Sequence, residues 1–322
     1  MPRIEILYTF PMKTLLLIDG HAMIHRAFHA LPDTMTTKNG EPTGAIYGFF
    51  MMLQKVIGDF KPSHLAIAFD TPKPTFRKKL YKGYQAKRPP MDSLLKQQIP
   101  HIKTLLDEGG VVRIEKPGFE ADDVIGTLVE KNKSQFERVL ILTGDRDLLQ
   151  LTDTNVFLIA PKRGVTNFDL FTPKEVEKKY GVTPEHIPDY KALAGDSSDN
   201  YHTAKGIGPK TTQLLLANYK TIEDLLANID AVANPRWQSI LRENKEKIIL
   251  FKKIATVLRN VEIDSSEKRL IFTGFAPDLK EGLKTFELFA LSKKLFHLPA
   301  SINAPAAPKK MKDETAEQIN LF

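Results

Sequence analysis

Three short and almost uniformly apolar runs stand out in the first half of the chain, at residues 14–19, 64–70 and 138–145. Runs of this length without polar alternation are typical of strands buried on both faces of a parallel sheet. Between them, residues 44–58 and 93–108 carry apolar positions at helical spacing. The pattern therefore predicts an α/β fold, with a mostly parallel sheet and flanking helices.

Each of the three runs ends on an aspartate, at Asp19, Asp70 and Asp145. Open parallel sheets bind ligands beyond the carboxyl ends of their strands, so these three side chains could face a single crevice. An aspartate at a strand end also hydrogen-bonds its own turn backbone. That alternative explains one such strand end more easily than three.

Further acidic residues follow in two clusters and at one isolated position. One cluster opens a helix within residues 118–131, where the helix dipole favours acids but accounts for one more easily than three. The other lies in residues 192–201, with two aspartates spaced i, i+3 on one face or one turn. The nine candidate metal ligands are Asp19, Asp70, Glu120, Asp122, Asp123, Asp145, Asp147, Asp196 and Asp199.

Converging carboxylates raise one another's pKa values unless cations balance them. Mg²⁺ and Mn²⁺ take oxygen ligands and also bind substrate phosphates. Two such ions about 4 Å apart are a known arrangement for phosphodiester hydrolysis. The acids therefore predict a site with two divalent metal ions.

Composition supports a polyanionic partner. The 322 residues carry a formal net charge of +7, with a pI near 9.2. The chain has no cysteine, which excludes disulfides and thiolate metal sites and fits a reducing cytosol. It shows neither a signal peptide nor an apolar run long enough to span a membrane. We expect a cytoplasmic protein without membrane attachment.

Several motifs in a fixed order resemble the bacterial 5′ nuclease family, whose flap endonucleases occur free or as the N-terminal domain of DNA polymerase I. The motifs include "RAFHALP", "TFRKKLYKGY", "FEADDVIGTL", "LTGDRDLLQL", "GDSSDN" and "GIGPKT", and the likeness runs from about residue 13 to about 296. The resemblance implies metal-dependent cleavage of 5′-flapped or 5′-ended duplex DNA, including removal of RNA primers. It also implies a monomer in the bacterial cytoplasm, close to the nucleoid.

The resemblance further implies a PIN-like sheet with a helical arch, and a helical subdomain with a helix–three-turn–helix motif. We expect the nuclease core at residues 13–180 with the arch at 76–108, the duplex-binding subdomain at 181–298, and a flexible tail at 299–322. The nine acids match the family's metal ligands one by one. Asp123, Asp147, Asp196 and Asp199 are expected at the second ion, and the other five at the more tightly bound one.

Residues 77–88 hold six basic side chains and no acid, with Tyr81 and Tyr84 between them. Basic side chains neutralise phosphates and aromatic rings stack on bases, so this stretch predicts a channel for a single strand. A solvated basic loop is the alternative. The resemblance implies a catalytic arginine and an activating lysine, but Gln85 stands at the usual lysine position. The expected residues are Arg88, with Lys82 or Lys87 as substitutes for that lysine, and Arg26, Arg77 and Tyr84 for DNA contact.

The stretch "GIGPKT" has two glycines for a tight turn and Pro209 at a helix start, where free backbone amides can hold a phosphate. The resemblance assigns it to the helix–three-turn–helix motif, which grips the duplex and often binds K⁺. The preceding "NYHTAK" departs from the family pattern, so the K⁺ site is less firmly implied. The residues expected at the duplex are Gly206, Gly208, Lys210 and Thr211.

Other interpretations concern metal choice and function class. His21, His25 and His29 are spaced i, i+4, i+8, which suits zinc on a helix face, although the nearby acids favour harder ions. A PIN-like ribonuclease and a non-catalytic, metal-stabilised DNA-binding protein are alternatives to the flap endonuclease. Cleavage of DNA or RNA with and without Mg²⁺ separates the three.

The last five residues, "QINLF", follow a stretch rich in Ala, Pro and charge. Such a composition is typical of a tether, which gains nothing from an exposed apolar end unless a partner buries it. The string resembles the motif with which bacterial proteins bind the sliding clamp. We therefore expect Gln318, Leu321 and Phe322 to bind the clamp.

Overall fold

The computed structural model describes residues 12–202 and 206–297. A six-stranded sheet runs through the centre, in the order β3-β2-β1-β4-β5-β6. Its first five strands are parallel and β6 is antiparallel to β5, which confirms the expected α/β fold. The strands are β1 (Thr14–Asp19), β2 (His64–Phe69), β3 (Val112–Glu115), β4 (Arg138–Leu142), β5 (Val156–Arg163) and β6 (Asn167–Phe171).

The apolar runs form the middle of the sheet because both of its faces are covered. Every residue of β1, β2 and β4 is buried. Leu15 and Leu17 belong to the core that includes α5, whereas Leu16 and Ile18 belong to the core that includes α1, α2 and α4. Those helices are α1 (Gly20–Ala30), α2 (Gly44–Phe60), α4 (Ser93–Glu108) and α5 (Ala121–Asn132).

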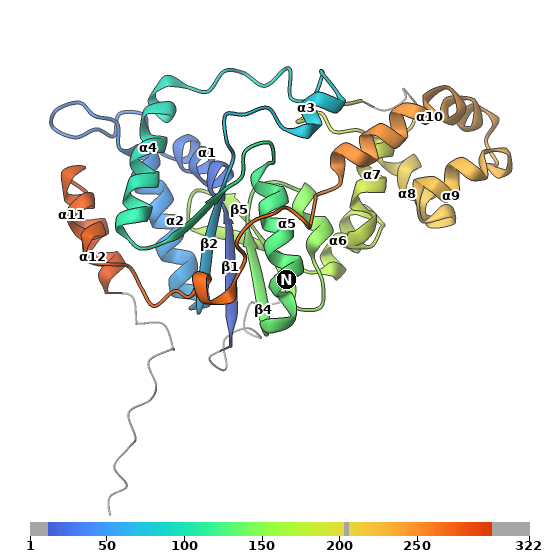
Figure 1. The fold of residues 1–322 in the computed structure, drawn as a ribbon. Helices are drawn as coiled ribbons and strands as arrows, with labels where there is room; N and C mark the ends of the chain where they lie inside the picture. Colours follow the sequence, from blue (N-terminus) through green and yellow to red (C-terminus); the bar gives the residue numbers. More distant parts are fainter. Residues whose placement is uncertain (1–11, 203–205, 298–322) are drawn as a thin grey trace, which may run out of the picture.

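A helical part follows the sheet and lies beside it (Figure 1). The chain reaches it through a 3-10 turn, η3 (Asp147–Leu151), then β5 and β6. Helix α10 packs against α7 and α9, with Leu241, Ile248 and Phe251 buried. The helices of this part are α6 (Pro173–Tyr180), α7 (Ile187–Ala194), α8 (Pro209–Tyr219), α9 (Ile222–Ala227) and α10 (Pro235–Ala255).

The last two helices return to the α/β body. They are α11 (Asp278–Thr285) and α12 (Phe289–Phe296), and their Leu279, Leu283 and Leu295 lie in the same core as α2 and α4. The expected helical subdomain at 181–298 therefore has its last turns on the nuclease core. None of the helices in the described ranges combines the length and apolar character that crossing a membrane requires.

The expected arch at 76–108 is helical only at its two ends. Helix α3 (Phe76–Leu80) is short, and residues 81–92, here called the crossing segment, form turns and extended chain that run over the sheet to α4 (Figure 1). Helix α4 belongs to the body, because its Leu95, Ile102 and Leu106 are buried in the core with α2. The arch is thus the crossing segment with α3 at its base.

A buried glutamine fixes the α4 end of this arch. Gln98 Oε1 accepts hydrogen bonds from the backbone N–H groups of Ala45 and Ile46, at 2.8 and 3.2 Å. Those donors lie in the first turn of α2, whose N-cap residue Thr43 makes no side-chain hydrogen bond to the helix. Gln98 therefore satisfies helix-end donors that otherwise lack partners.

Candidate metal and nucleic-acid site

Five carboxylates gather at the carboxyl edge of the sheet and are here called the first carboxylate cluster. Three of them lie at or just after the ends of β2, β1 and β4, which are neighbours in the sheet, and the others lie where α5 begins. Their charges interact with one another. The cluster consists of Asp19, Asp70, Glu120, Asp122 and Asp145.

Hydrogen bonds from the surrounding turns orient this cluster. Asp19 caps α1 by accepting from the N–H of Ala22 at 3.0 Å, and it accepts from the Thr143 hydroxyl at 2.9 Å. Asp70 accepts from the N–H of Ala121 at 2.8 Å. The turn interpretation of strand-end aspartates is thus correct locally, yet the same turns bring the side chains together.

The electrostatics of the first cluster show an excess of negative charge. Burial, followed by the charges of Asp70 and Asp145, raises the pKa of Asp19 to about 7. Burial and then the charge of Asp145 also raise the pKa of Asp122 well above its usual value. Carboxylates with these pKa values lack a counterion, which is what a divalent cation supplies.

Asp147, Asp196 and Asp199 form the second carboxylate cluster, in which one ligand atom from each lies within 4.8 Å of the others. Asp147 begins η3, and the two other acids sit in the turn between α7 and α8. That turn is closed by backbone hydrogen bonds between Asp196 and Tyr201, at 2.8 and 3.0 Å. The i, i+3 spacing therefore places both aspartates in one turn, as the sequence predicts.

Two basic side chains of the chain itself form ion pairs with the three acids of the second cluster. Lys191 pairs with Asp147, and its Nζ lies 2.6 Å from Asp196 Oδ2. Arg88 Nη2 lies 2.8 Å from Asp199 Oδ1. Burial alone would raise the pKa of Asp196, but Lys191 and hydrogen bonds from Ser198 lower it to about 2. Lys191 was not foreseen from the sequence, where a lysine five residues before an aspartate carries no signal.

Asp123 adjoins Glu120 of the first cluster but is held in a buried ion pair with Arg77. The guanidinium donates to both carboxylate oxygens, at 2.7 and 2.8 Å, and both side chains are at most 3% exposed. Asp123 also accepts from the N–H groups of Leu258 and Glu120, at 2.9 and 3.1 Å. The geometry supports a structural role for Asp123 and Arg77, and their expected metal and DNA contacts stay predictions.

The crossing segment lies on the turn that carries the second cluster. The N–H of Gln85 donates to the Asp199 carbonyl at 2.9 Å, and its side-chain amide donates to Asp199 Oδ1 at 3.2 Å. The Asn200 side chain donates to the Gly83 carbonyl at 2.8 Å. The residue at the family's lysine position thus contacts a candidate metal ligand as a neutral group.

The other residues expected at the nucleic acid differ in exposure. Lys82 and Lys87 are exposed on the crossing segment. Tyr84 is only 4% exposed and donates its hydroxyl hydrogen to Glu120 at 3.0 Å, so it orients an acid and leaves no ring face for stacking on a base. Arg26 is half-buried, and its Nε donates to the carbonyl of Gly164 at 3.1 Å.

The turn before α8 has the backbone that the glycine pattern predicts. Gly206 has a φ of +115°, which favours glycine, and Gly208 is the N-terminal cap of α8, followed by Pro209. Lys210 is exposed and Thr211 is half-buried. Residues 203–205, which belong to the "NYHTAK" segment before this turn, lie outside the described residues, as do Gln318, Leu321 and Phe322.

The histidines of α1 do not form a zinc site in the described part of the chain. His21 Nδ1 accepts from the N–H of Asp70 at 3.1 Å, which occupies that nitrogen. The rings of His25 and His29 stack with centroids 6.3 Å apart. Carboxylates alone make up the group that brings three ligand atoms together among the described residues.

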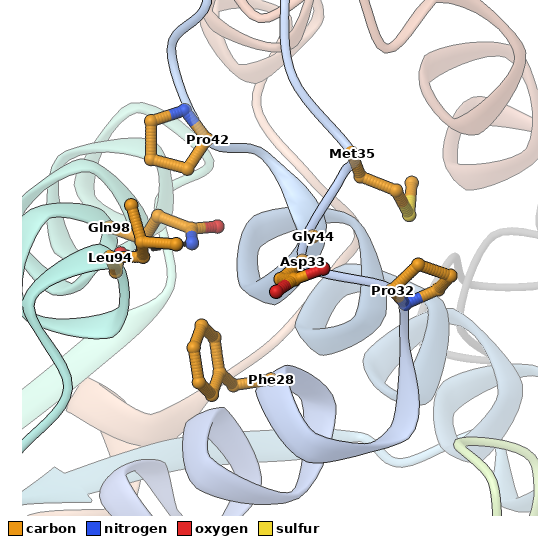
Figure 2. A pocket seen from close by; sticks show the side chains of 8 residues that line it. All are labelled: Phe28, Pro32, Asp33, Met35, Pro42, Gly44, Leu94 and Gln98. Carbon is orange, nitrogen blue, oxygen red and sulfur yellow. Dashed lines mark hydrogen bonds between the residues drawn. The ribbon is translucent and has the colours of Figure 1, made fainter.

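A pocket lies between the end of α1, the loop after it and α4 (Figure 2). Phe28 and Leu94 line it together with Pro32, Met35 and Pro42. No residue of either carboxylate cluster lines it, and the amide of its one buried polar residue, Gln98, is already hydrogen-bonded to α2 and α4. The pocket is therefore not part of the acidic site.

Two family descriptions match consecutive parts of the chain. The family description "5′-3′ exonuclease, N-terminal resolvase-like domain" matches residues 14–181, and "5′-3′ exonuclease, C-terminal SAM fold" matches residues 182–278. The chain belongs to the 5′-3′ exonuclease family. It is 40% identical over 291 residues to the 5′-3′ exonuclease of Aquifex aeolicus, a match that covers 88% of this chain and 96% of that protein.

This member of the exonuclease family is also similar to part of a longer relative and to solved structures. It is 39% identical over 263 residues to DNA polymerase I of Bacillus subtilis, which covers 82% of the chain but 30% of that relative. Its fold is similar to the T5 D15 protein co-crystallised with metal ions, with a TM-score of 0.63 at 16% identity over 88% of this chain and 99% of that one. It is also similar to the catalytic core of Rad2 in complex with DNA, with a TM-score of 0.60 at 17% identity over 92% and 95% of the two chains.

The raised pKa of Asp19 predicts how stability depends on pH when metal is absent. Folded Asp19 keeps a proton up to about pH 7, whereas the unfolded chain releases it near the usual value of 3.8. The folded state thus binds more protons in this window, so the free energy of unfolding falls as pH rises from about 4 to about 7. Since one pKa unit is about 1.4 kcal/mol, the loss amounts to a few kcal/mol.

Urea unfolding in EDTA at several pH values measures this loss. Asp19→Asn should reduce the slope, leaving the contributions of Asp122 and of the other acids with raised pKa values, and saturating Mg²⁺ should abolish most of it in the unsubstituted chain. A slope that is equally steep in Asp19→Asn would contradict the assignment.

The Arg77–Asp123 pair predicts a loss of stability rather than of DNA affinity. Arg77→Met leaves a buried carboxylate without its partner, which costs about 3–5 kcal/mol. Adding Asp123→Asn removes the stranded charge and should restore part of that loss, whereas Lys78→Met on the exposed face of α3 should change stability by less than about 0.5 kcal/mol. Urea unfolding measures all three, and weaker DNA binding by a fully stable Arg77→Met would restore the DNA-contact role.

Proposed function

We propose that the chain is a structure-specific 5′-3′ exonuclease and flap endonuclease, acting on 5′-flapped and 5′-ended duplex DNA and on RNA primers. The observation that carries this proposal is the meeting of the two carboxylate clusters at one edge of the sheet, under a basic crossing segment. Metal-dependent hydrolysis of a polyanion uses carboxylates to bind the metal ions and basic side chains to bind the phosphates.

The two carboxylate clusters fit hard divalent ions. All their donors are oxygens, the first cluster lacks counterions, and the second brings three ligand atoms together. We propose one Mg²⁺ or Mn²⁺ at the first cluster and one at the second. Bound there, the ions would lower the pKa of an attacking water and stabilise the leaving oxygen. Asp123 is left out of this ligand set because it is fully buried and both of its oxygens accept from the Arg77 guanidinium.

The residues of the chain bind and orient the substrate around these ions. Lys82 and Lys87 are exposed cations on the crossing segment, suited to neutralise phosphates of the 5′ strand. Arg88 is half exposed and sits at Asp199, from which it can reach a phosphate held at the second cluster. These three are our candidates for stabilising the transition state, since Gln85 carries no charge.

The turn before α8 supports a role in holding the duplex. Its glycine backbone leads into a helix start with Lys210 exposed beside it, which suits a phosphate contact. We propose that Gly206, Gly208, Lys210 and Thr211 contact the duplex backbone, and Arg26 a phosphate nearer the clusters. Binding of K⁺ at this turn stays a proposal from the resemblance.

The test of the function uses labelled 5′-flap DNA, single-stranded RNA and blunt duplex, each with Mg²⁺ or EDTA. Asp145→Asn removes one ligand charge and little volume, so it should abolish flap cleavage while preserving binding of the flap DNA. Asp278→Asn, an exposed acid on α11, is the matched control and should cleave normally.

The outcomes separate the function classes. Full activity in EDTA or in Asp145→Asn would contradict the metal-dependent mechanism. Cleavage of single-stranded RNA alone would favour a PIN-like ribonuclease, and flap binding without cleavage a non-catalytic DNA-binding protein.

We also propose, on the sequence alone, that Gln318, Leu321 and Phe322 bind the bacterial sliding clamp, and that the chain is a monomer that works in the bacterial cytoplasm at the nucleoid. Tethering through even a weak motif raises the enzyme's local concentration at replication sites. Deleting residues 318–322 should leave cleavage of free flap DNA unchanged and abolish co-elution with the clamp in size-exclusion chromatography. Equal clamp binding by the truncated and full chains would contradict this proposal.

A further inference from the structure

Lys191 holds the position that a cation would take in the second carboxylate cluster. It lies in the last turn of α7, where its carbonyl accepts from the N–H of Gly195 at 2.8 Å and so closes the helix. Its side chain reaches between Asp147 and Asp196 and is only 12% exposed. A buried lysine bridging two acids is a built part of the site rather than a solvated surface group.

The first cluster has no comparable cation. Arg77 approaches Glu120 at 3.4 Å, but Asp19, Asp122 and Asp145 have no ion pair within 4.0 Å among the described residues. The two clusters therefore differ in their charge balance before any metal binds. One has an ion pair only at Glu120, and the other has two cations of the chain for its three carboxylates.

We propose that Lys191 is an internal counterion that a divalent metal must displace to enter the second carboxylate cluster. An ammonium and a metal ion compete for the same carboxylate oxygens and repel each other at a few ångströms. Lys191 thus stabilises the metal-free site and weakens binding of the second ion. Since it acts through Asp147 and Asp196, it is a positioning residue. The proposal rests on the two metal sites of the proposed function.

The role of Lys191 is tested by metal affinity rather than by cleavage. Lys191→Met and Lys191→Gln remove the charge, Lys191→Arg keeps it, and Lys178→Met on the exposed face of α6 is the matched control. The full chains are titrated with Mn²⁺, and free ion is counted by electron paramagnetic resonance. Both neutral variants should bind the second ion about tenfold more tightly than the unsubstituted chain, because a unit charge a few ångströms away changes affinity by at least that order. Lys191→Arg and Lys178→Met should not.

A second measurement needs no substitution. Acetic anhydride labelling followed by mass spectrometry should find the Lys191 amine protected in EDTA and modified several times faster in saturating Mn²⁺, while Lys178 reacts equally in both. This measurement decides the matter if the neutral variants do not fold.

The outcomes keep the two proposals apart. Equal affinity for the second ion in the unsubstituted chain and both neutral variants would overturn the role of Lys191, as would labelling of Lys191 that ignores Mn²⁺, and either result leaves the metal-dependent function standing. An unsubstituted chain that binds no Mn²⁺ would overturn the proposed function and this inference with it.

Discussion

The buried pair of Arg77 and Asp123 joins the parts of the molecule that the site needs. Arg77 starts the arch, Asp123 lies in the first turn of α5, and the same guanidinium donates to the carbonyls of Ile254 and Thr256 at the end of α10, at 2.8 and 3.0 Å. The Arg77 guanidinium thus joins the arch to the edge of the sheet and to the helical part. Such a pair adds little net stability over an apolar replacement, but breaking it is costly, so its main effect is to fix geometry.

A second constraint is the electrostatic cost of gathering acids. In the first carboxylate cluster this repulsion, together with burial, raises the pKa values of Asp19 and Asp122. The second cluster reduces it by ion pairs with Lys191 and Arg88, although burial and the charge of Asp145 still raise the pKa of Asp199. The repulsion that remains between the carboxylates is largest in the first cluster, where a bound metal ion would reduce it. The two carboxylate clusters of the site therefore differ in how many of their acids are paired with cations of the chain.

Much of this arrangement was predictable where the local pattern is strong. The runs at 14–19 and 64–70, and the helix at 93–108, coincide with β1, β2 and α4 because buried strands and amphipathic helices have distinct periodicities. The edge strand β3, with four residues, gave no such signal. Asp123 looked like its acidic neighbours, since only tertiary packing sets it against Arg77. Lys191 was missed for the same reason: its partner Asp147 is 44 positions away along the chain.

The crossing segment has a length as well as a charge. Arg77 on one side and Gln98 on the other are hydrogen-bonded to the body of the protein. The number of residues between these two points therefore limits the distance that the crossing segment can span. Fully free, residues 81–92 span at most roughly 40 Å of extended chain. With residues 81–88 lying on the Asp199 turn, only 89–92 stay free, about 14 Å. Five hydrogen bonds hold residues 81–88 on that turn, so they set how much of the crossing segment spans the acidic edge.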